Sequence, residues 1–259
     1  MRPRTFVAAA LILLPAMGAK ADIALPLSHD GALSSPHLTV AGLKPGVKES
    51  VAAAIAVAER ATRKALAAEE PIRQAMKAAS AAGRMPGYGA RDIVFAGASC
   101  RYQGQMIRRR ATGLGVMTCP ARIFAGQFRD GMLDGLGGDT SRNANDGYEG
   151  EYRHGARMGL GVERDQDGFY PGRYGFVPDA QGRRINMEIL GLQNFKDTHW
   201  AGRYGAYRGP KIACTLIRGA VLEGSVLDGY GAKFDGRGRL IEQGFYRLGL
   251  LQNGSGPPC

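Results

Sequence analysis

Residues 148–168 read YEGEYRHGARMGLGVERDQDG, and this stretch decides the fold. Its aromatic residues and glycines occupy alternate positions in two places, at Tyr148, Gly150 and Tyr152 and then at Gly159 and Gly161. Alternate residues share one face of a β-strand. The segment 153–158 between the two places contains Gly155, which can adopt the positive φ of a tight turn. The stretch therefore predicts a β-hairpin.

The pairing of the two strands follows from the need to seat the aromatic rings. We expect Gly150 to lie opposite Gly161 and Tyr152 to lie opposite Gly159. Each ring can then lie flat on neighbouring backbone that carries no side chain. A single hairpin is marginally stable in water, so further hairpins must pack beside this one.

The same pattern recurs along the chain. Aromatic residues stand at the first and fifth positions of the template, and glycines follow the first position by two, seven, eleven and thirteen residues. Full or partial copies start at Tyr102, Phe124, Tyr148, Tyr170, Trp200, Leu222 and Glu242. A spacing of 20 to 30 residues between copies is typical of a repeat array, here of about seven units.

This pattern resembles the MORN repeat, whose signature is aromatic-x-Gly-x-aromatic followed by Gly and by Gly-x-Gly. The resemblance covers about residues 100–255. It implies a run of β-hairpins that form an elongated, twisted antiparallel sheet. Members of the family usually act as binding or scaffolding modules, sometimes at membranes and sometimes attached to enzymes. The expected fold class is thus mainly β, with the array over residues 84–259 and a helical segment before it.

The helical segment is the alanine-rich stretch 47–83. Its apolar stripe has helical spacing and consists of Val47, Val51, Ile55, Ala58, Thr62 and Ala65. Because proline is tolerated in a first helical turn but not in an interior one, Pro71 predicts a break. We expect one helix to about Ala68 and a second that Gly83 ends. The stripe either packs on the rest of the domain or binds a partner helix.

The first 21 residues have the layout of a secretory signal peptide. Arg2 and Arg4 precede an apolar run, and Ala19-Lys20-Ala21 is a small-x-small cleavage site. Residues 22–46 contain three prolines and are expected to form an irregular arm. No later segment is apolar for long enough to span a membrane, so we expect an exported protein, periplasmic or extracellular.

The four cysteines are Cys100, Cys119, Cys214 and Cys259. An even number is expected of a protein from an oxidising compartment. The register expected for the hairpins places Cys100 directly opposite Cys119, at a spacing that a disulfide spans. We therefore predict the pairs Cys100–Cys119 and Cys214–Cys259, although other pairings stay open.

The formal net charge is +11, and loss of Arg2, Arg4 and Lys20 with the signal peptide reduces it to +8. A basic exported protein favours a protein partner with an acidic face, or an anionic lipid or polysaccharide surface of the cell envelope. No nucleic-acid-binding motif is present. The sequence leaves the oligomeric state open.

Known catalytic motifs such as G-x-S-x-G, the P-loop and H-E-x-x-H are absent from the sequence. The sequence Asp165-Gln-Asp167-Gly168 resembles the start of a calcium loop but lacks the later ligands. We therefore predict a non-enzymatic protein without a cofactor or metal ion. One alternative is a glycan- or lipid-active hydrolase, which would need two converging carboxyl groups from the set Glu149, Glu151, Glu163 and Asp165. Another is a purely structural protein that oligomerises through its helix.

Two candidate binding surfaces remain. The first, the basic edge, gathers cations at hairpin turns, which are Arg108, Arg109, Arg110, Arg129, Arg153, Arg157, Arg208 and Lys211. The second, the aromatic face, consists of Phe124, Phe128, Tyr148, Tyr152, Tyr170, Tyr174, Trp200 and Tyr204. The simpler interpretations are that turns are charged because they are exposed, and that the rings form the core.

Overall fold

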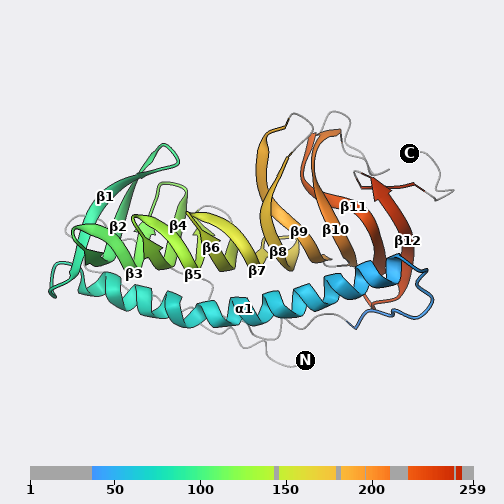
Figure 1. The fold of residues 1–259 in the computed structure, drawn as a ribbon, viewed down its shortest axis with the longest axis horizontal. Helices are drawn as coiled ribbons and strands as arrows, with labels where there is room; N and C mark the ends of the chain where they lie inside the picture. Colours follow the sequence, from blue (N-terminus) through green and yellow to red (C-terminus); the bar gives the residue numbers. More distant parts are fainter. Residues whose placement is uncertain are drawn as a thin grey trace, which may run out of the picture.

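The computed structural model describes residues 37–142, 146–178, 182–195, 197–210, 221–247 and 249–252. It contains one helix, α1 (Val47–Ala81), and a thirteen-stranded antiparallel sheet whose strands follow one another in chain order. The strands are β1 (Tyr88–Phe95), β2 (Ala98–Ile107), β3 (Arg110–Thr118), β4 (Arg122–Arg129), β5 (Met132–Ser141), β6 (Gly147–Arg153), β7 (Ala156–Arg164), β8 (Gly168–Pro178), β9 (Arg184–Phe195), β10 (Thr198–Pro210), β11 (Val221–Asp235), β12 (Leu240–Arg247) and β13 (Leu250–Leu251). Figure 1 shows these strands side by side along the helix. The fold class is therefore the predicted one.

Some sequence predictions lie outside the described residues. These are the signal peptide, most of the irregular arm, the pair Cys214–Cys259 and Lys211. The backbone of Arg208 lies in β10, but its side chain is not among those described.

The predicted hairpin of residues 148–162 is β6–β7, and its pairing is partly as expected. Gly150 lies opposite Gly161, and a Cβ atom on Gly150 would lie 2.5 Å from the Cα of Gly161. The prediction that Tyr152 faces Gly159 is wrong, because the register shifts and Tyr152 faces Arg157. On its other side Tyr152 lies opposite Gly135 of β5. The aromatic residue therefore meets a glycine of the preceding hairpin rather than of its own.

A β-bulge causes this shift, and the same bulge occurs in the hairpins β2–β3, β4–β5 and β6–β7. The extra residues lie on the returning strands, and the single residues that face them are Gln105, Gln127 and Glu151. Each side chain accepts a hydrogen bond from a backbone N–H of the facing strand, at 2.6, 2.7 and 2.7 Å from Leu114, Leu136 and Leu160. The unpaired residue thus satisfies a backbone donor that the bulge would otherwise leave without a partner.

The aromatic rings rest on glycine backbone, as predicted. A Cβ atom on Gly161 would lie 2.3 Å from Cζ of Tyr148, and one on Gly115 would lie 2.5 Å from Cζ of Tyr102. The rings also contact one another edge to face, and the centroid of Tyr148 lies 4.9 Å from that of Tyr174. The glycines are therefore hollows that the rings of the same face fill.

The helix is continuous, so the predicted break at Pro71 is wrong. Pro71 lies inside α1, which has 35 residues. Proline removes one helical hydrogen bond. However, Ala68 and Ile72 are both buried, at 0% and 1% exposure. Packing on each side of Pro71 therefore holds the helix together, and α1 ends at Ala81, shortly before Gly83 as predicted.

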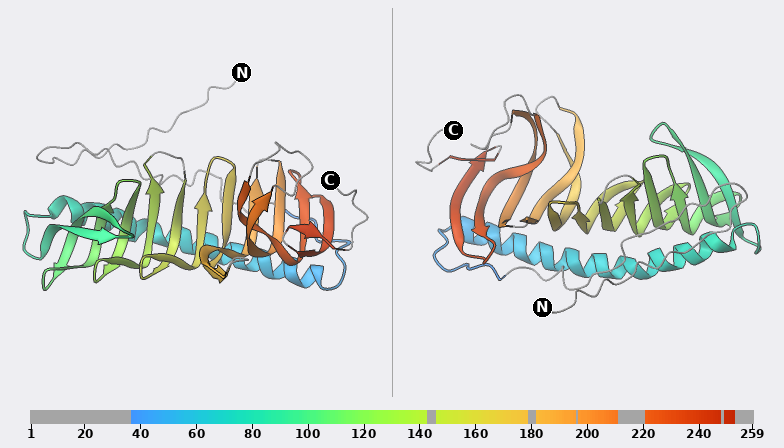
Figure 2. Two further views of the ribbon diagram at one scale, coloured as in Figure 1. Left: turned by 90° about the horizontal axis from the view of Figure 1, so that it is seen from above. Right: turned by 180° about the vertical axis from the view of Figure 1, so that it is seen from behind.

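Helix α1 spans the whole array on the face opposite the rings. Its first half packs on β9–β11 through Val51 and Leu192, and its second half packs on β3 and β4 through Ile72 and Val116. The helix thus runs from the last hairpins back to the first, as Figures 1 and 2 show. A helix of this length measures about 52 Å, and twelve strands spaced by about 4.8 Å span about 53 Å. The buried positions of α1 are mostly alanine, which allows close approach to the sheet.

In the part of the chain that the structure describes, the array contains six hairpins, from β2–β3 to β12–β13, rather than the seven predicted units. The copy that starts at Leu222 is not a separate hairpin, because Gly224 lies in β11 opposite Tyr207 of β10. Further along β11, Gly231 pairs with Gly202 and, on its other side, with Gly244 of β12. Long strands in the later hairpins explain why the sequence spacing misled the count.

The disulfide Cys100–Cys119 is present, with Cα atoms 4.3 Å apart. It continues the pairing of Arg101 with Thr118, so the register predicted from the glycines is correct at this end of the hairpin. A disulfide of this kind is compatible with an exported protein.

Candidate functional site

The aromatic face is buried. Seven of its eight residues are between 1% and 9% exposed, and only Trp200 is partly exposed. Phe128, Tyr148, Tyr152 and Tyr174 belong to one core cluster that also contains the disulfide. This burial favours the simpler interpretation that the rings form the core, although Tyr170 and Trp200 also line a pocket.

The basic edge lies along the turns within the hairpins. Arg108 and Arg109 form the β2–β3 turn, both with positive φ, as in a type I′ turn. Arg110, Arg129 and Arg153 flank the turns of the first three hairpins, and all are exposed. The structure therefore brings five of the eight predicted cations to one edge of the sheet.

Acidic side chains partly neutralise this edge. Asp130 lies 3.0 Å from Arg110, and Asp134 lies 3.8 Å from Arg129. Asp134 also lies 3.6 Å from the ring of His154. The three basic side chains are largely exposed, so each contact contributes little to stability. The edge is most basic at the β2–β3 turn.

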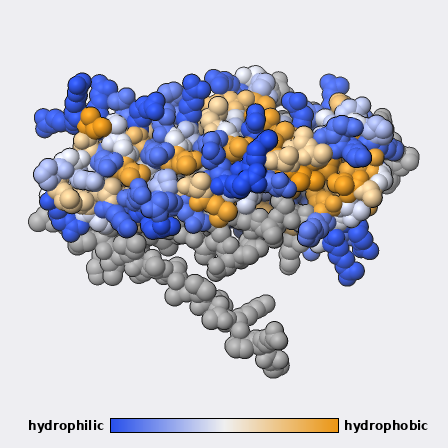
Figure 3. All heavy atoms as spheres, turned by 60° about the horizontal axis from the view of Figure 1, so that its bottom comes forward, coloured by the Kyte–Doolittle hydropathy of each residue, from blue (hydrophilic) through white to orange (hydrophobic). Residues whose placement is uncertain are grey.

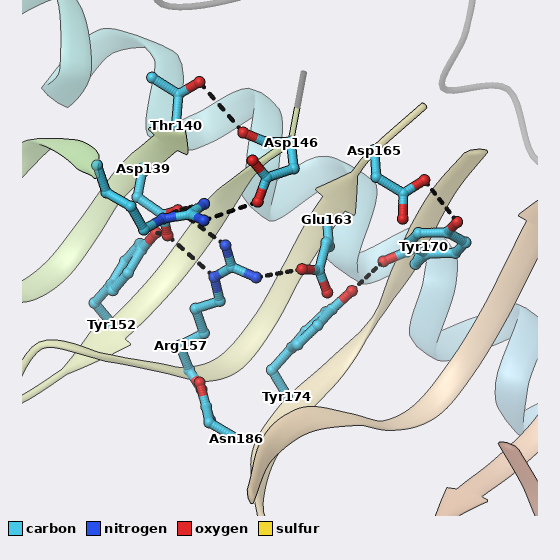
Figure 4. Close-up of polar contacts among 11 residues, drawn as sticks. Asp139, Thr140, Asp146, Tyr152, Arg157, Glu163, Asp165, Tyr170, Tyr174 and Asn186 are labelled. Carbon is cyan, nitrogen blue, oxygen red and sulfur yellow. Dashed lines mark hydrogen bonds and ion pairs between the residues drawn. The ribbon is translucent and has the colours of Figure 1, made fainter. Parts of the chain in front are cut away.

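Arg157 does not belong to the basic edge, and its prediction as an edge residue is wrong. Its guanidinium donates two hydrogen bonds to Asp139, at 2.9 and 3.0 Å, and forms an ion pair with Glu163. It also lies 5.1 Å from the ring centroid of Tyr148. Figure 4 shows Arg157 between the two carboxylates. The side chain points to the core because β7 places it on the ring-bearing face.

Asp139 is the centre of this buried polar network. Its carboxylate also accepts hydrogen bonds from Arg122, at 2.8 Å, and from the hydroxyl of Tyr152. Burial alone would raise the pKa of Asp139, but Arg157 and Arg122 outweigh burial and hold the pKa below its ordinary value. Loss of one partner from a buried ion pair typically costs about 3–5 kcal/mol. The network is therefore a fixed part of the core.

The four carboxylates of the hydrolase hypothesis lie in different places. Glu149 faces the helix side, where burial raises its pKa to about 7 despite its ion pair with Arg164. Glu151 lies opposite the bulge of β7, and its carboxylate is 3.0 Å from the amino group of Lys64 of α1. Glu163 and Asp165, by contrast, line the same pocket. The hypothesis therefore survives only for that pocket.

This acidic pocket has a volume of about 580 Å³ and lies on the ring-bearing face, between residues of β7 and residues of β11. Its carboxyl groups belong to Glu163, Asp165, Asp167 and Glu188, and its rings belong to Tyr170, Phe195 and Trp200. Glu188 is 2% exposed, and burial raises its pKa well above the ordinary value. Figure 4 shows Glu163, Asp165 and Tyr170 next to the Asp139 network.

Sequence reasoning missed several of these residues. The residues opposite the bulges carried a usable signal, because Gln105, Gln127 and Glu151 occupy the same position in three copies of the template. Glu188 carried none, because it lies outside the template. The side chain of Glu188 packs on glycine backbone, as the aromatic rings do elsewhere in the sheet. A Cβ atom on Gly172 would lie 2.2 Å from its Oε1, and one on Gly191 would lie 2.3 Å from it.

Among the described residues, no helix is both long and apolar enough to cross a membrane. Within the same residues, no group of three or more His, Cys, Asp or Glu side chains is placed to hold a metal ion. Figure 3 views the molecule with its helix side turned forward and shows hydrophilic residues over much of that surface.

The model of the MORN repeat family matches residues 124–137 and 148–169. These segments contain the two complete copies of the template, in β4–β5 and β6–β8. These two segments are thus similar to MORN repeats in sequence, and the sheet of stacked hairpins is consistent with a MORN-repeat protein. No curated protein matched the chain. MORN repeats suggest a binding or scaffold module, of the protein-binding or membrane-binding kind.

Proposed function

We propose that this chain is an exported, non-enzymatic binding module that docks on an anionic surface of the cell envelope through its basic edge. The observation that carries the proposal is the β2–β3 turn. Arg108 and Arg109 have φ of 49° and 62°, a conformation that favours glycine and asparagine. The equivalent turns end in Gly131 and Gly155.

Two arginines in this conformation cost stability, by about 1–2 kcal/mol each. Strained backbone of this kind concentrates at functional sites. Both side chains are exposed, next to Arg110. Cations in a row on a stiff sheet contact a flat anionic surface together, and each contributes about 1 kcal/mol near anionic lipid. The row, rather than any single contact, supplies the affinity.

The exported location rests on the N-terminal sequence and on the disulfide Cys100–Cys119. The helix does not favour the oligomerising alternative, because its apolar stripe is packed against the sheet. The surface opposite the rings is therefore already covered within one chain.

Vesicle sedimentation tests the proposal. The purified protein is expected to bind phosphatidylcholine vesicles that contain phosphatidylglycerol, to bind pure phosphatidylcholine weakly, and to lose binding as salt is added. Reversal of three charges in R108E/R109E/R110E is expected to weaken binding by about tenfold or more.

The matched control is R60E/R63E/R237E, which changes the net charge equally at exposed residues away from the edge. This control is expected to bind within a few-fold of the parent. Equal losses in both triple variants would indicate attraction by net charge alone, and undiminished binding by the edge variant would refute the proposal.

A further inference from the structure

The acidic pocket differs in charge from the rest of the protein. The chain has a formal net charge of +11. Four of the described residues that line the pocket carry carboxyl groups, and the described lining contains no Lys, Arg or His. A concave site lined by groups of one charge concentrates ligands of the opposite charge. Its volume of about 580 Å³ lies within the range of small-molecule sites.

Two of the four carboxylates already have internal roles. Glu163 forms an ion pair with Arg157. Asp165 accepts a hydrogen bond from the hydroxyl of Tyr170, at 2.8 Å, and two more from backbone N–H groups. These contacts fix the wall of the pocket. A ligand therefore has to interact mainly with the other two carboxyl groups.

Glu188 is the second and independent sign of a ligand. Its Oε2 accepts a hydrogen bond from Gln193, at 3.2 Å, but its Oε1 is buried without a hydrogen-bond partner among the described residues. A buried polar atom without a partner is uncommon and costs about 1–3 kcal/mol. Asp167 lies exposed at the same pocket. One buried acidic group with an oxygen that has no hydrogen-bond partner among the described residues and one exposed acidic group thus line the pocket.

The aromatic side chains of the pocket form a continuous row. The ring centroids of Tyr170 and Phe195 lie 5.6 Å apart, and those of Phe195 and Trp200 lie 5.1 Å apart. The amino group of Lys233 already lies 5.1 Å from the Trp200 centroid. Faces of such rings attract cations, most strongly where water is excluded.

We propose that this pocket binds a small organic cation with a primary ammonium group, which contacts Glu188 and Asp167 while its alkyl chain lies along Tyr170, Phe195 and Trp200. An ammonium group has three donors, which suit the buried oxygen of Glu188 and the exposed carboxylate of Asp167. Burial raises the pKa of Glu188 well above its ordinary value, and a bound cation would favour the ionised form. This site is separate from the basic edge and takes ligands of the opposite charge.

Isothermal titration calorimetry with 1,5-diaminopentane tests the proposal, with 1,5-pentanediol as a neutral probe of the same length. The diamine is expected to bind the wild-type protein, and the diol is not. Glu188→Gln keeps the shape of the side chain and is expected to weaken diamine binding by about tenfold or more, the usual effect of losing a charged hydrogen bond. Asp167→Asn is expected to weaken it by about threefold, because this group is exposed.

The matched control is Asp92→Asn, which removes an exposed carboxylate of β1 and is expected to leave binding unchanged. Circular dichroism establishes that each variant folds. If Glu188→Gln does not fold, Asp167→Asn decides the outcome. Equal binding of the diol would indicate a site for neutral hydroxyl groups and overturn the proposal. So would absence of diamine binding, or unchanged binding in both pocket variants. Vesicle binding through the basic edge is expected to be the same in the pocket variants, so the two proposals fail separately.

Discussion

Replacement of Gly161 by alanine tests whether the ring of Tyr148 requires bare backbone beneath it. A Cβ atom at this position would lie 2.2 Å from the hydroxyl oxygen of Tyr148 and 2.3 and 2.6 Å from two carbon atoms of its ring. Carbon atoms in contact lie about 3.5–4.0 Å apart, so the ring has to move by about 1 Å or more. Gly161 is not among the residues with positive φ, so backbone strain adds nothing.

The ring of Tyr148 has little room to move. Tyr148 is 1% exposed, and its ring contacts Tyr152 and Tyr174 at centroid distances of 5.3 and 4.9 Å. Its hydroxyl donates a hydrogen bond to the backbone oxygen of Glu151, at 3.3 Å. Overpacking of a core costs about 1–3 kcal/mol, and loss of the hydrogen bond adds about 1 kcal/mol. We expect Gly161→Ala to lower the free energy of unfolding by about 3 kcal/mol.

Urea denaturation measures this loss, with fluorescence of Trp200, the single tryptophan, and circular dichroism as probes. The control is Gly236→Ala, because its Cβ atom would have no neighbour closer than 3.5 Å and its φ is not positive. We expect this control to stay within about 0.5 kcal/mol of the parent.

A double-mutant cycle identifies the ring as the cause. In a Tyr148→Ala background the hollow is empty, so Gly161→Ala is expected to change stability by less than about 1 kcal/mol. If Gly161→Ala is no more harmful than Gly236→Ala, or equally harmful with and without the ring, then the rings do not rest on glycine in the way described.

Two further predictions concern ionisation and covalent structure. Burial raises the pKa of Glu149 from 4.5 to about 7. Between these pH values the folded state holds a proton that the unfolded state has lost, so the free energy of unfolding falls as pH rises. The shift corresponds to about 3 kcal/mol. Urea denaturation at pH 5 and pH 8 measures this effect. The free energy of unfolding of Glu149→Gln relative to the parent is expected to be higher at pH 8 than at pH 5, by up to about this amount. Parallel pH profiles of the two proteins would contradict the shift. Removal of the disulfide by C100A/C119A opens a loop with a sequence separation of 19 residues and is expected to lower the free energy of unfolding by about 3 kcal/mol. The reduced wild type serves as its reference, and an unchanged urea midpoint in both would show that the crosslink does not contribute.

The sequence predicted two pairs of partners correctly, and in both pairs the partners lie close along the chain. Gly150 and Gly161 face each other across one hairpin, and Cys100 and Cys119 across another. A period of two residues in each strand leaves few possible registers. The bulge opposite Glu151 escaped this reasoning, because the template gave the spacing of glycines but not which residues leave the regular pairing.

Of the candidate surfaces, the sequence located the basic edge better than the interior. Hairpin turns lie at one edge of any stacked array, so Arg108, Arg129 and Arg153 were placed correctly. Arg157 was misplaced, because only its strand position shows that it points to Asp139. Of the acidic pocket the sequence named only Glu163 and Asp165, as carboxylates of the hydrolase alternative, since the pocket combines residues of β7 to β11 with no common spacing.

The amino-acid sequence by itself determined the repeat, the hairpins, the need for glycine under the rings and the Cys100–Cys119 bond, because these depend on contacts within about twenty residues. Only the tertiary structure decided that α1 runs backwards along the whole sheet, that Pro71 lies inside it, and that the rings are buried. Contacts such as that of Val51 with Leu192 join residues far apart in the chain. Their geometry depends on how many hairpins stack and how the sheet twists, which no local pattern specifies.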